Sequence, residues 1–292
     1  MGLFFSGELK TDMYTLDKPS VIVRDVARYY RADNKRSIFR RPQLSNEREG
    51  DFVRALDGVS MYAKKGECIG VLGRNGSGKS TLMRLIAGNE APDEGEILLS
   101  STPTLLNVSA ALQPRLPGRT NIRLGLLAQG VDQNQIDSLT DEIIDFAEIG
   151  KAVDRPMKTY SSGMGARLKF AISTAVQREL LLIDEALGTG DASFTERAQE
   201  RMNSFLTNAG TIFLVSHAMS SIKSMCTRVV WLHDGQIIAD GDVTTITLLY
   251  NKWTARMARK NFESAEELIC GVKGVYKKPS ILFDSQVSKF LN

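Results

Sequence analysis

The chain has 292 residues, of which 42% are hydrophobic and 24% are charged, with a formal net charge of +3 at pH 7. This composition predicts a globular protein with one large domain, and the small charge argues against a nucleic-acid-binding protein. The distant Cys68, Cys226 and Cys270 exclude a disulfide framework and a CxxC metal site, and no apolar run approaches the ~20 residues of a spanning helix.

The first part of the chain predicts an extension, a strand and a basic loop. Residues 1–20 have no clear periodicity, whereas the alternating segment from Pro19 to Tyr30 predicts a strand. A basic loop is expected over 31–54, because seven Lys or Arg residues lie between Arg24 and Arg41. This loop is either a solvated surface or a segment that lies against anionic lipid headgroups.

Strands and helices alternate in the rest of the chain. Continuous apolar runs at Cys68–Leu72, Leu180–Asp184 and Thr211–His217 predict strands buried on both faces. Helical periodicity covers 80–87, closed by Gly88, and returns over about 121–149. The alternation predicts an α/β fold with a parallel sheet, whose ligand lies at the carboxyl ends of the strands. A helix is expected from Asp242 to about Arg259, followed by a Lys-rich tail.

The segment GRNGSGKS matches the phosphate-loop pattern G-x-x-x-x-G-K-[ST] and stands between a buried strand and a helix. Small residues let backbone N–H groups converge on phosphates, and the helix N-terminus adds partial positive charge. Lys79 can reach the β- and γ-phosphates of a nucleotide, and Ser80 can ligate Mg²⁺. The predicted nucleotide contacts are Gly73, Asn75, Gly76, Ser77, Gly78, Lys79, Ser80 and Thr81.

Two adjacent carboxylates, Asp184 and Glu185, follow the apolar run LLLI. Successive strand residues point to opposite sides, so the pair can divide its roles. Asp184 is expected to hold the Mg²⁺ shell, and Glu185 to orient and deprotonate the attacking water. Hydrophobic residues followed by Asp-Glu are common, and alone they indicate a solvated strand end. After a phosphate loop in the same chain, they favour a nucleotide site instead.

The segment YSSGM at 160–164 resembles the LSGGQ signature of the ABC ATPases, at its usual place before the Asp-Glu pair. The resemblance implies that Ser161, Ser162 and Gly163 cap a helix that faces the ATP of a partner subunit. It also implies that Asp191 lies in the family's D-loop at the dimer interface. His217 would be the switch histidine and, with Glu185, catalytic. His233, in a predicted WLHDG turn, receives no role.

The resemblance extends the expected fold. It implies a P-loop NTPase core of parallel strands, an antiparallel β subdomain and an inserted α-helical subdomain over about 115–175. The ATPase domain would span 21–250, and 251–292 would form a C-terminal helix and tail without a carbohydrate-binding domain. ATP and Mg²⁺ are the implied cofactors.

The form of the signature is similar to that of ATPases that export lipid-linked polysaccharides, such as O-antigen, wall teichoic acid, capsule and galactan. LQPRLPGRTNI and GDASF add to this resemblance. It implies a homodimer at the cytoplasmic face of the plasma membrane, peripheral to an integral membrane permease that carries the lipid-linked polysaccharide, and no nucleic-acid partner. The glycan itself is not identified.

Two site assignments have alternatives. The family's Q-loop residue, a further Mg²⁺ ligand, corresponds to Asn107 or, in another register, to Gln113. The aromatic residue that stacks on adenine is Tyr30 or Tyr29, with Tyr30 preferred and core packing as the alternative.

Other classes of function fit less well. A soluble ABC ATPase acting on nucleic acid is expected to carry long coiled coils or two cassettes, and this chain has neither. A GTPase or kinase would lack the YSSGM segment. An ABC ATPase for another exported substrate stays open.

Overall fold

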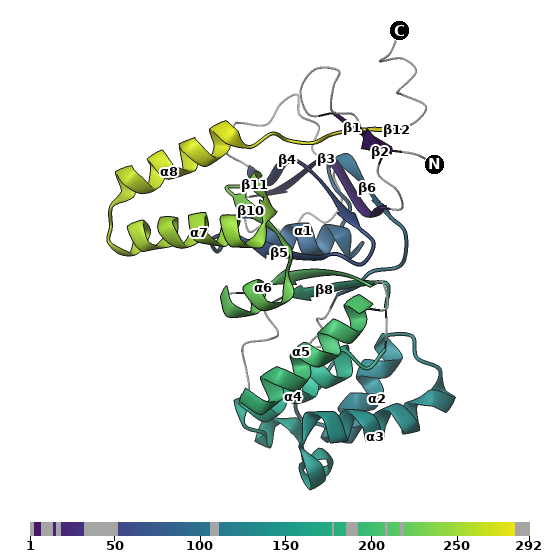
Figure 1. Ribbon diagram of the computed structural model, residues 1–292. Helices are drawn as coiled ribbons and strands as arrows, with labels where there is room; N and C mark the ends of the chain where they lie inside the picture. Colours follow the sequence, from purple (N-terminus) through teal and green to yellow (C-terminus); the bar gives the residue numbers. More distant parts are fainter. Residues whose placement is uncertain are drawn as a thin grey trace.

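The computed structural model describes residues 3–6, 14–15, 19–31, 52–105, 111–176, 178–184, 192–207, 210–216 and 219–283. They form a central sheet, an antiparallel sheet beside it, a group of helices on the other side and a C-terminal pair of helices (Figure 1). Among these residues, no helix is both long and apolar enough to cross a membrane.

The central sheet has six strands in the order β11-β10-β5-β9-β8-β7. These strands are Gln236–Asp242 (β11), Arg228–His233 (β10), Cys68–Leu72 (β5), Thr211–Val215 (β9), Leu180–Asp184 (β8) and Thr104–Leu105 (β7). Neighbours pair in parallel, except that β11 runs antiparallel to β10. Every residue of β5 and β9 is buried, because a parallel sheet is covered on both faces. The predicted parallel sheet is therefore confirmed.

An antiparallel sheet lies over the first helix. It is ordered β4-β3-β6, with β4 at Phe52–Lys64, β3 at Pro19–Arg31 and β6 at Glu94–Leu99. Helix α1, Lys79–Ile86, lies between the two sheets (Figure 1). Its Leu82 and Ile86 are fully buried in one cluster with core residues of both sheets, and each such side chain contributes about 2 kcal/mol of burial. This packing fixes α1 and the loop before it.

The basic loop is shorter than predicted. Arg31 ends β3, and Phe52 to Arg54 belong to β4, because the apolar and aromatic residues at these positions continue the strand pairing. Residues 32–51 lie outside the described part of the chain.

The group of helices contains α2 at Gly118–Ala128, α3 at Ile136–Ala147 and α4 at Ser162–Ser173. They share a core that includes Ile122, Ile143 and Leu168. The single helical stretch predicted over 121–149 is two helices, because Gly130 turns the chain with a φ of 75°. Two further helices, α5 at Ala192–Thr207 and α6 at Met219–Met225, pack nearer the central sheet.

The C-terminal part contains more structure than the predicted helix and tail. Helix α7, Val243–Ala258, is followed by a second helix, α8, at Phe262–Val275. Lys260, rather than a glycine, adopts the left-handed conformation between them, with a φ of 58°, so the usual signal for a helix end is absent from the sequence. Asn261 then caps α8 by accepting a hydrogen bond from the backbone N–H of Ser264.

Both ends of the described chain form a small sheet. Strand β12, Ser280–Phe283, pairs with β1, Leu3–Ser6, which also pairs with β2, Tyr14–Thr15. The predicted N-terminal extension therefore contains two short strands, and β1 pairs with the other end of the described chain, Leu3 opposite Phe283 and Ser6 opposite Ser280. Sequence periodicity cannot detect so distant a pairing.

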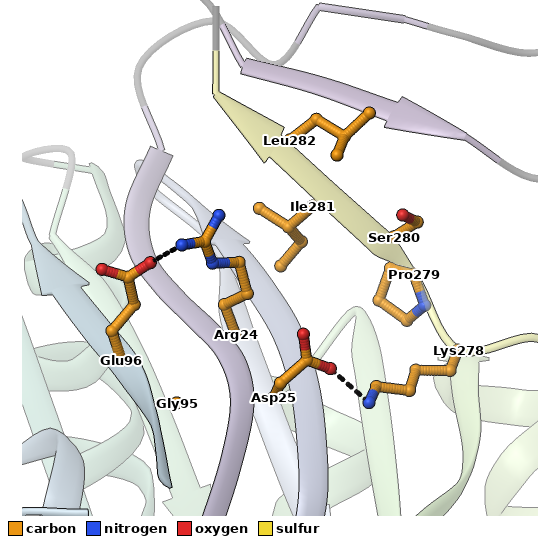
Figure 2. Close-up of a pocket in the computed structure, with 9 residues that line it drawn as sticks. All are labelled: Arg24, Asp25, Gly95, Glu96, Lys278, Pro279, Ser280, Ile281 and Leu282. Atoms are coloured by element: carbon orange, nitrogen blue, oxygen red, sulfur yellow. Dashed lines mark hydrogen bonds and ion pairs between the residues drawn. The ribbon is translucent and has the colours of Figure 1, made fainter. Parts of the chain in front are cut away.

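The segment before β12 crosses the antiparallel sheet and borders a hollow of about 770 Å³ (Figure 2). Lys278 forms an ion pair with Asp25, and Arg24 forms one with Glu96. The hydrogen bond from Lys278 lowers the pKa of Asp25. The first pair ties the segment to β3 and the second joins β3 to β6. Both pairs are partly exposed and therefore contribute little to stability.

A buried amide organises the loop before α2. Asn121 is fully buried, and its Nδ2 donates to the carbonyl oxygens of Gln113 and Leu116 at 3.0 Å each. Its Oδ1 accepts from the backbone N–H of Gln113 at 2.6 Å. One side chain thus satisfies backbone groups that would otherwise be buried without partners.

We expect Asn121→Ala to lower the free energy of unfolding by about 2 to 4 kcal/mol, because it leaves several backbone groups of the loop without hydrogen bonds. Urea unfolding followed by circular dichroism measures this. Gln113→Ala is the matched control, since the Gln113 side chain is exposed and its backbone keeps both bonds. Equal stability of the two variants would contradict the role of the Asn121 amide.

Candidate functional site

The phosphate-loop segment joins β5 to α1 and is held by close backbone contacts. A Cβ at Gly73 would lie 2.4 Å from the carbonyl oxygen of Leu232, and a Cβ at Gly78 would lie 2.5 Å from that of Ala55. Real Cβ atoms do not approach so closely, and both glycines have positive φ, 155° and 104°. Only glycine fits at either position.

Lys79 is folded back on this loop. Its side chain is buried, and its Nζ donates to the carbonyl oxygens of Gly73 at 2.7 Å and Arg74 at 2.9 Å. The loop is closed further by a hydrogen bond from the Ser77 N–H to the Arg74 carbonyl at 3.1 Å. The ammonium group therefore lies inside the loop, next to the start of α1.

The start of α1 suits an anion. Its N-cap, Gly78, offers no side-chain hydrogen bond, and the first turn contains no acidic residue, so the first N–H groups lack the usual side-chain acceptor. The Ser77 hydroxyl is buried without a hydrogen-bond partner. Together with Lys79, these donors fit a phosphate group. Asn75, Gly76 and Ser80 are exposed at the rim, whereas Thr81 is buried behind it.

Other predicted residues lie at the same edge of the sheet or outside the described residues. Asp184 ends β8 and pairs with Val215 of β9, which is the neighbour of β5. Parallel strands end at a common edge, so the backbone of Asp184 lies at the edge from which the phosphate loop emerges. The following predicted site residues lie outside the described part of the chain: Asn107, Glu185, Asp191 and His217.

The YSSGM segment begins α4, as predicted. Ser161 is the N-cap and accepts a hydrogen bond from the Met164 N–H at 3.2 Å, and the helix starts at Ser162. A Cβ at Gly163 would meet only the Ser161 hydroxyl, at 4.0 Å, so the space before it is open. Figure 1 shows α4 among the lower helices, apart from α1. Within one chain, this segment and the phosphate loop do not form a common site.

Tyr160 anchors the segment from behind. Its hydroxyl donates to the Ala152 carbonyl at 2.7 Å, and burial raises its pKa. A Cβ at Gly118 would lie 2.2 Å from this hydroxyl. The tyrosine ring therefore passes directly over the first residue of α2.

Tyr30 lies near the end of α1 rather than in open space. Its hydroxyl donates to Glu90, which also accepts from Arg84 at 2.7 Å and from Arg28 at 3.3 Å. Burial raises the pKa of Glu90, but the hydrogen bonds from Tyr30 and Arg84 and the charges of the two arginines outweigh it, so that the pKa is lowered. The Arg28 guanidinium lies 5.0 Å from the Tyr30 ring centroid. Adenine stacking by Tyr30 and packing in the core both stay open.

Tyr29 and Gln113 are the alternatives to Tyr30 and Asn107. The ring of Tyr29 is covered by Arg54, whose guanidinium lies 5.1 Å from its centroid. Gln113 is exposed, with its backbone bound to Asn121. Because Asn107 lies outside the described residues, the choice between Asn107 and Gln113 as a metal ligand stays a prediction.

The turn predicted at WLHDG is present but shorter, and it joins two strands behind the phosphate loop. His233 is not in a turn but ends β10, and Asp234 and Gly235 form the turn with φ values of 45° and 77°. The Gly235 N–H donates to the Ser77 carbonyl of the phosphate loop at 3.1 Å. An Asp-Gly pair between two apolar segments is the signal for such a two-residue hairpin.

Comparison with protein families identifies the ABC transporter family over residues 56–188. The teichoic acids export ATP-binding protein TagH of Staphylococcus haemolyticus is 34% identical over 244 residues, which cover 83% of this chain and 92% of that protein. TagH of Bacillus anthracis is 39% identical over 243 residues, which cover 83% of this chain but 44% of that protein. The chain thus spans about half the length of several curated relatives that it matches.

Solved structures support the fold. A dimeric ATP-binding cassette in a post-hydrolysis state with ADP and Pi matches with a TM-score of 0.63 at 19% identity, over 76% of this chain and 98% of that one. CbiO1 of Clostridium perfringens, part of an ABC transporter complex, matches with a TM-score of 0.58 at 19% identity, over 83% of this chain and 96% of that one. The predicted fold class is confirmed.

The role of Tyr30 can be separated from its hydrogen bond to Glu90. If its ring stacks on adenine, Tyr30→Phe should keep MgATP affinity, whereas Tyr30→Ala should weaken it about fivefold or more, since stacking contributes ~1 to 3 kcal/mol. Isothermal titration calorimetry with MgATP measures both. Loss of affinity in Tyr30→Phe would instead assign the effect to the Glu90 network, and unchanged affinity in Tyr30→Ala would leave packing as the role.

Proposed function

This chain belongs to the ATP-binding proteins of the ABC transporter family, and from that membership we propose that it hydrolyses ATP as a homodimer to drive export through a separate membrane permease. The observation that carries the proposal is the start of α1. Backbone N–H groups without a side-chain cap, the buried Ser77 hydroxyl and the inward Lys79 ammonium lie together there. Such a set of donors without a carboxylate suits the phosphates of a nucleotide.

Each residue of the site has one proposed task. Lys79 exchanges its bonds to the loop carbonyls for the β- and γ-phosphates. Ser80 and Asp184 would hold Mg²⁺, with Asn107 or Gln113 as a further ligand, and the bound metal would neutralise phosphate charge. Glu185 accepts a proton from the attacking water, and His217 contacts the γ-phosphate. Residues at the carboxyl ends of neighbouring strands would thus bind the nucleotide and provide the general base.

The second half of the site comes from another copy of the chain. The open space before Gly163 and the position of α4 apart from α1 support this arrangement. In a head-to-tail dimer, Ser161, Ser162 and Gly163 of one subunit would close on the nucleotide held by Lys79 of its partner. Asp191 would lie at the interface between them.

The exported cargo is proposed to be a lipid-linked cell-envelope polysaccharide of the teichoic acid type. Similarity to TagH proteins over most of this chain supports this cargo. The ATPase would then act at the cytoplasmic face of the membrane, bound to the permease. Export of another substrate is the main alternative.

Within this chain, cargo selection is not expected to reside after Tyr250. The described residues there form the rest of α7 and α8, which pack on the ATPase core, and β12, which pairs with β1. We propose that the permease and the lipid-pyrophosphate end of the cargo take part in selection.

If Glu185 is the general base, Glu185→Gln should bind MgATP normally while hydrolysis falls by on the order of 10²-fold or more. In cells, this variant should stop export and cause lipid-linked polymer to accumulate in the cytoplasm. Phosphate release and lipid-extract analysis measure the two effects.

A Glu196→Gln variant is the matched control, because it makes the same chemical change on α5. Near-normal turnover of Glu185→Gln would remove Glu185 from the catalytic role. Loss of turnover with normal export of every lipid-linked polymer would leave an ABC ATPase with a different cargo.

Sharing of the site between subunits predicts complementation. Lys79→Ala and Gly163→Asp should each abolish activity, but a mixed dimer contains one site with neither substitution. Mixing and reassembling the two inactive proteins should therefore restore part of the ATPase rate. Two tags and tandem purification isolate the mixed dimer, and an inactive mixed dimer would argue against a composite site that works alone.

A further inference from the structure

The β10–β11 turn is part of the wall that holds the phosphate loop. Besides the bond from Gly235 to Ser77, the Gly235 carbonyl accepts from the Asp57 N–H at 2.9 Å. The Leu232 carbonyl lies where a Cβ of Gly73 would be, within 2.4 Å. A shift of this hairpin must therefore move the loop, because the backbones are in direct contact and leave no room for independent motion.

His233 connects this turn to the C-terminal helices. Its ring is 7% exposed and lies 5.8 Å from the ring of Trp253 on α7, at an interplanar angle of 86°. Its Nδ1 is buried with no hydrogen-bond partner, so packing, rather than hydrogen bonding through Nδ1, joins the ring to the helix. Edge-to-face ring contacts of this kind are favourable beyond the area that they bury.

Buried ring contacts hold the helical hairpin α7–α8 at this point. Trp253 is 4% exposed and packs against Trp231 at 5.8 Å and Tyr250 at 5.5 Å. A second connection runs from Lys273 of α8, which donates to Gln236 at 3.4 Å, and Gln236 donates to Asp57 at 2.9 Å. Two separate contacts thus join the hairpin to the strand turn behind the phosphate loop.

We propose that the α7–α8 hairpin seats the phosphate loop through the β10–β11 turn, with His233 as the positioning residue between them. The inference rests on the proposed nucleotide site. A displacement of α7 would move His233, then the Asp234–Gly235 turn, and then the Ser77 carbonyl. Factors that reposition the C-terminal helices would therefore change nucleotide affinity without touching the nucleotide.

The surroundings of His233 make the position of the phosphate loop dependent on pH. Burial lowers the pKa of His233; Asp234 and Glu266 oppose this shift, whereas Lys273 of α8 and Arg74 of the phosphate loop reinforce it. Its folded pKa thus lies below the ordinary value of 6.5. Acid favours conformations in which the imidazole is exposed and protonated, so the seated loop should lose population as the pH falls below about 6.5.

The test compares MgATP binding to the full chain by calorimetry. At pH 7.5, His233→Ala should raise the dissociation constant about fivefold or more, because it removes the ring contact. His233→Phe keeps a ring against Trp253 and should retain the wild-type value. As the pH is lowered to 5.5, wild-type affinity should fall more steeply than that of His233→Phe.

A structural control separates this effect from general destabilisation. Ile143→Ala makes a comparable cavity in α3, where Ile143 is 1% exposed, and should lower the melting temperature but not MgATP affinity. Equal affinity losses in His233→Ala and Ile143→Ala, or identical pH profiles of wild type and His233→Phe, would overturn the proposal. If neither the wild type nor Lys79→Ala binds MgATP, the assignment of the nucleotide site is wrong.

Discussion

The close approach of the backbones of β4 and β10 to the phosphate loop is the constraint on which the rest of the structure depends. Carbonyl oxygens of Leu232 and Ala55 occupy the space that side chains at Gly73 and Gly78 would need. These contacts give the loop its shape before any ligand binds, and such preorganisation reduces the cost of binding. Both sheets must therefore be in place for the loop to form, since Ala55 belongs to β4 and Leu232 to β10.

Division of the site between layers follows from this arrangement. The two sheets and α1 share one core, whereas most buried residues of α4 lie in a second core with α2 and α3. Phe170 of α4 joins these helices to the core of the central sheet, and a largely separate core allows the group of helices to move as a body relative to the sheets. In the proposed dimer, that movement would bring the donors of one subunit to the phosphate groups held by the other.

Local patterns predicted the strand, loop and helix around Lys79 and the parallel sheet, because each depends on neighbouring residues. The helix that begins at YSSGM was expected from the family resemblance. The sequence could not predict features made by distant pairing. The β1–β12 pairing joins opposite ends of the described chain. Lys260, instead of a glycine, adopts the left-handed conformation before α8, so the sequence contains no glycine signal for the helix end. The ring of His233 contacts Trp253 on α7, which is distant in the sequence. For Glu185, His217, Asp191 and Asn107, the sequence remains the basis of assignment.

The contact between Tyr160 and Gly118 limits how this sequence can change over evolution. With the tyrosine hydroxyl 2.2 Å from the position of a Cβ at residue 118, a side chain there requires a smaller or displaced residue at 160. Neither change is tolerated easily alone, so the two positions should vary together. Relatives with a smaller residue at the position of Tyr160 are therefore the ones in which Gly118 can be replaced by a residue with a side chain.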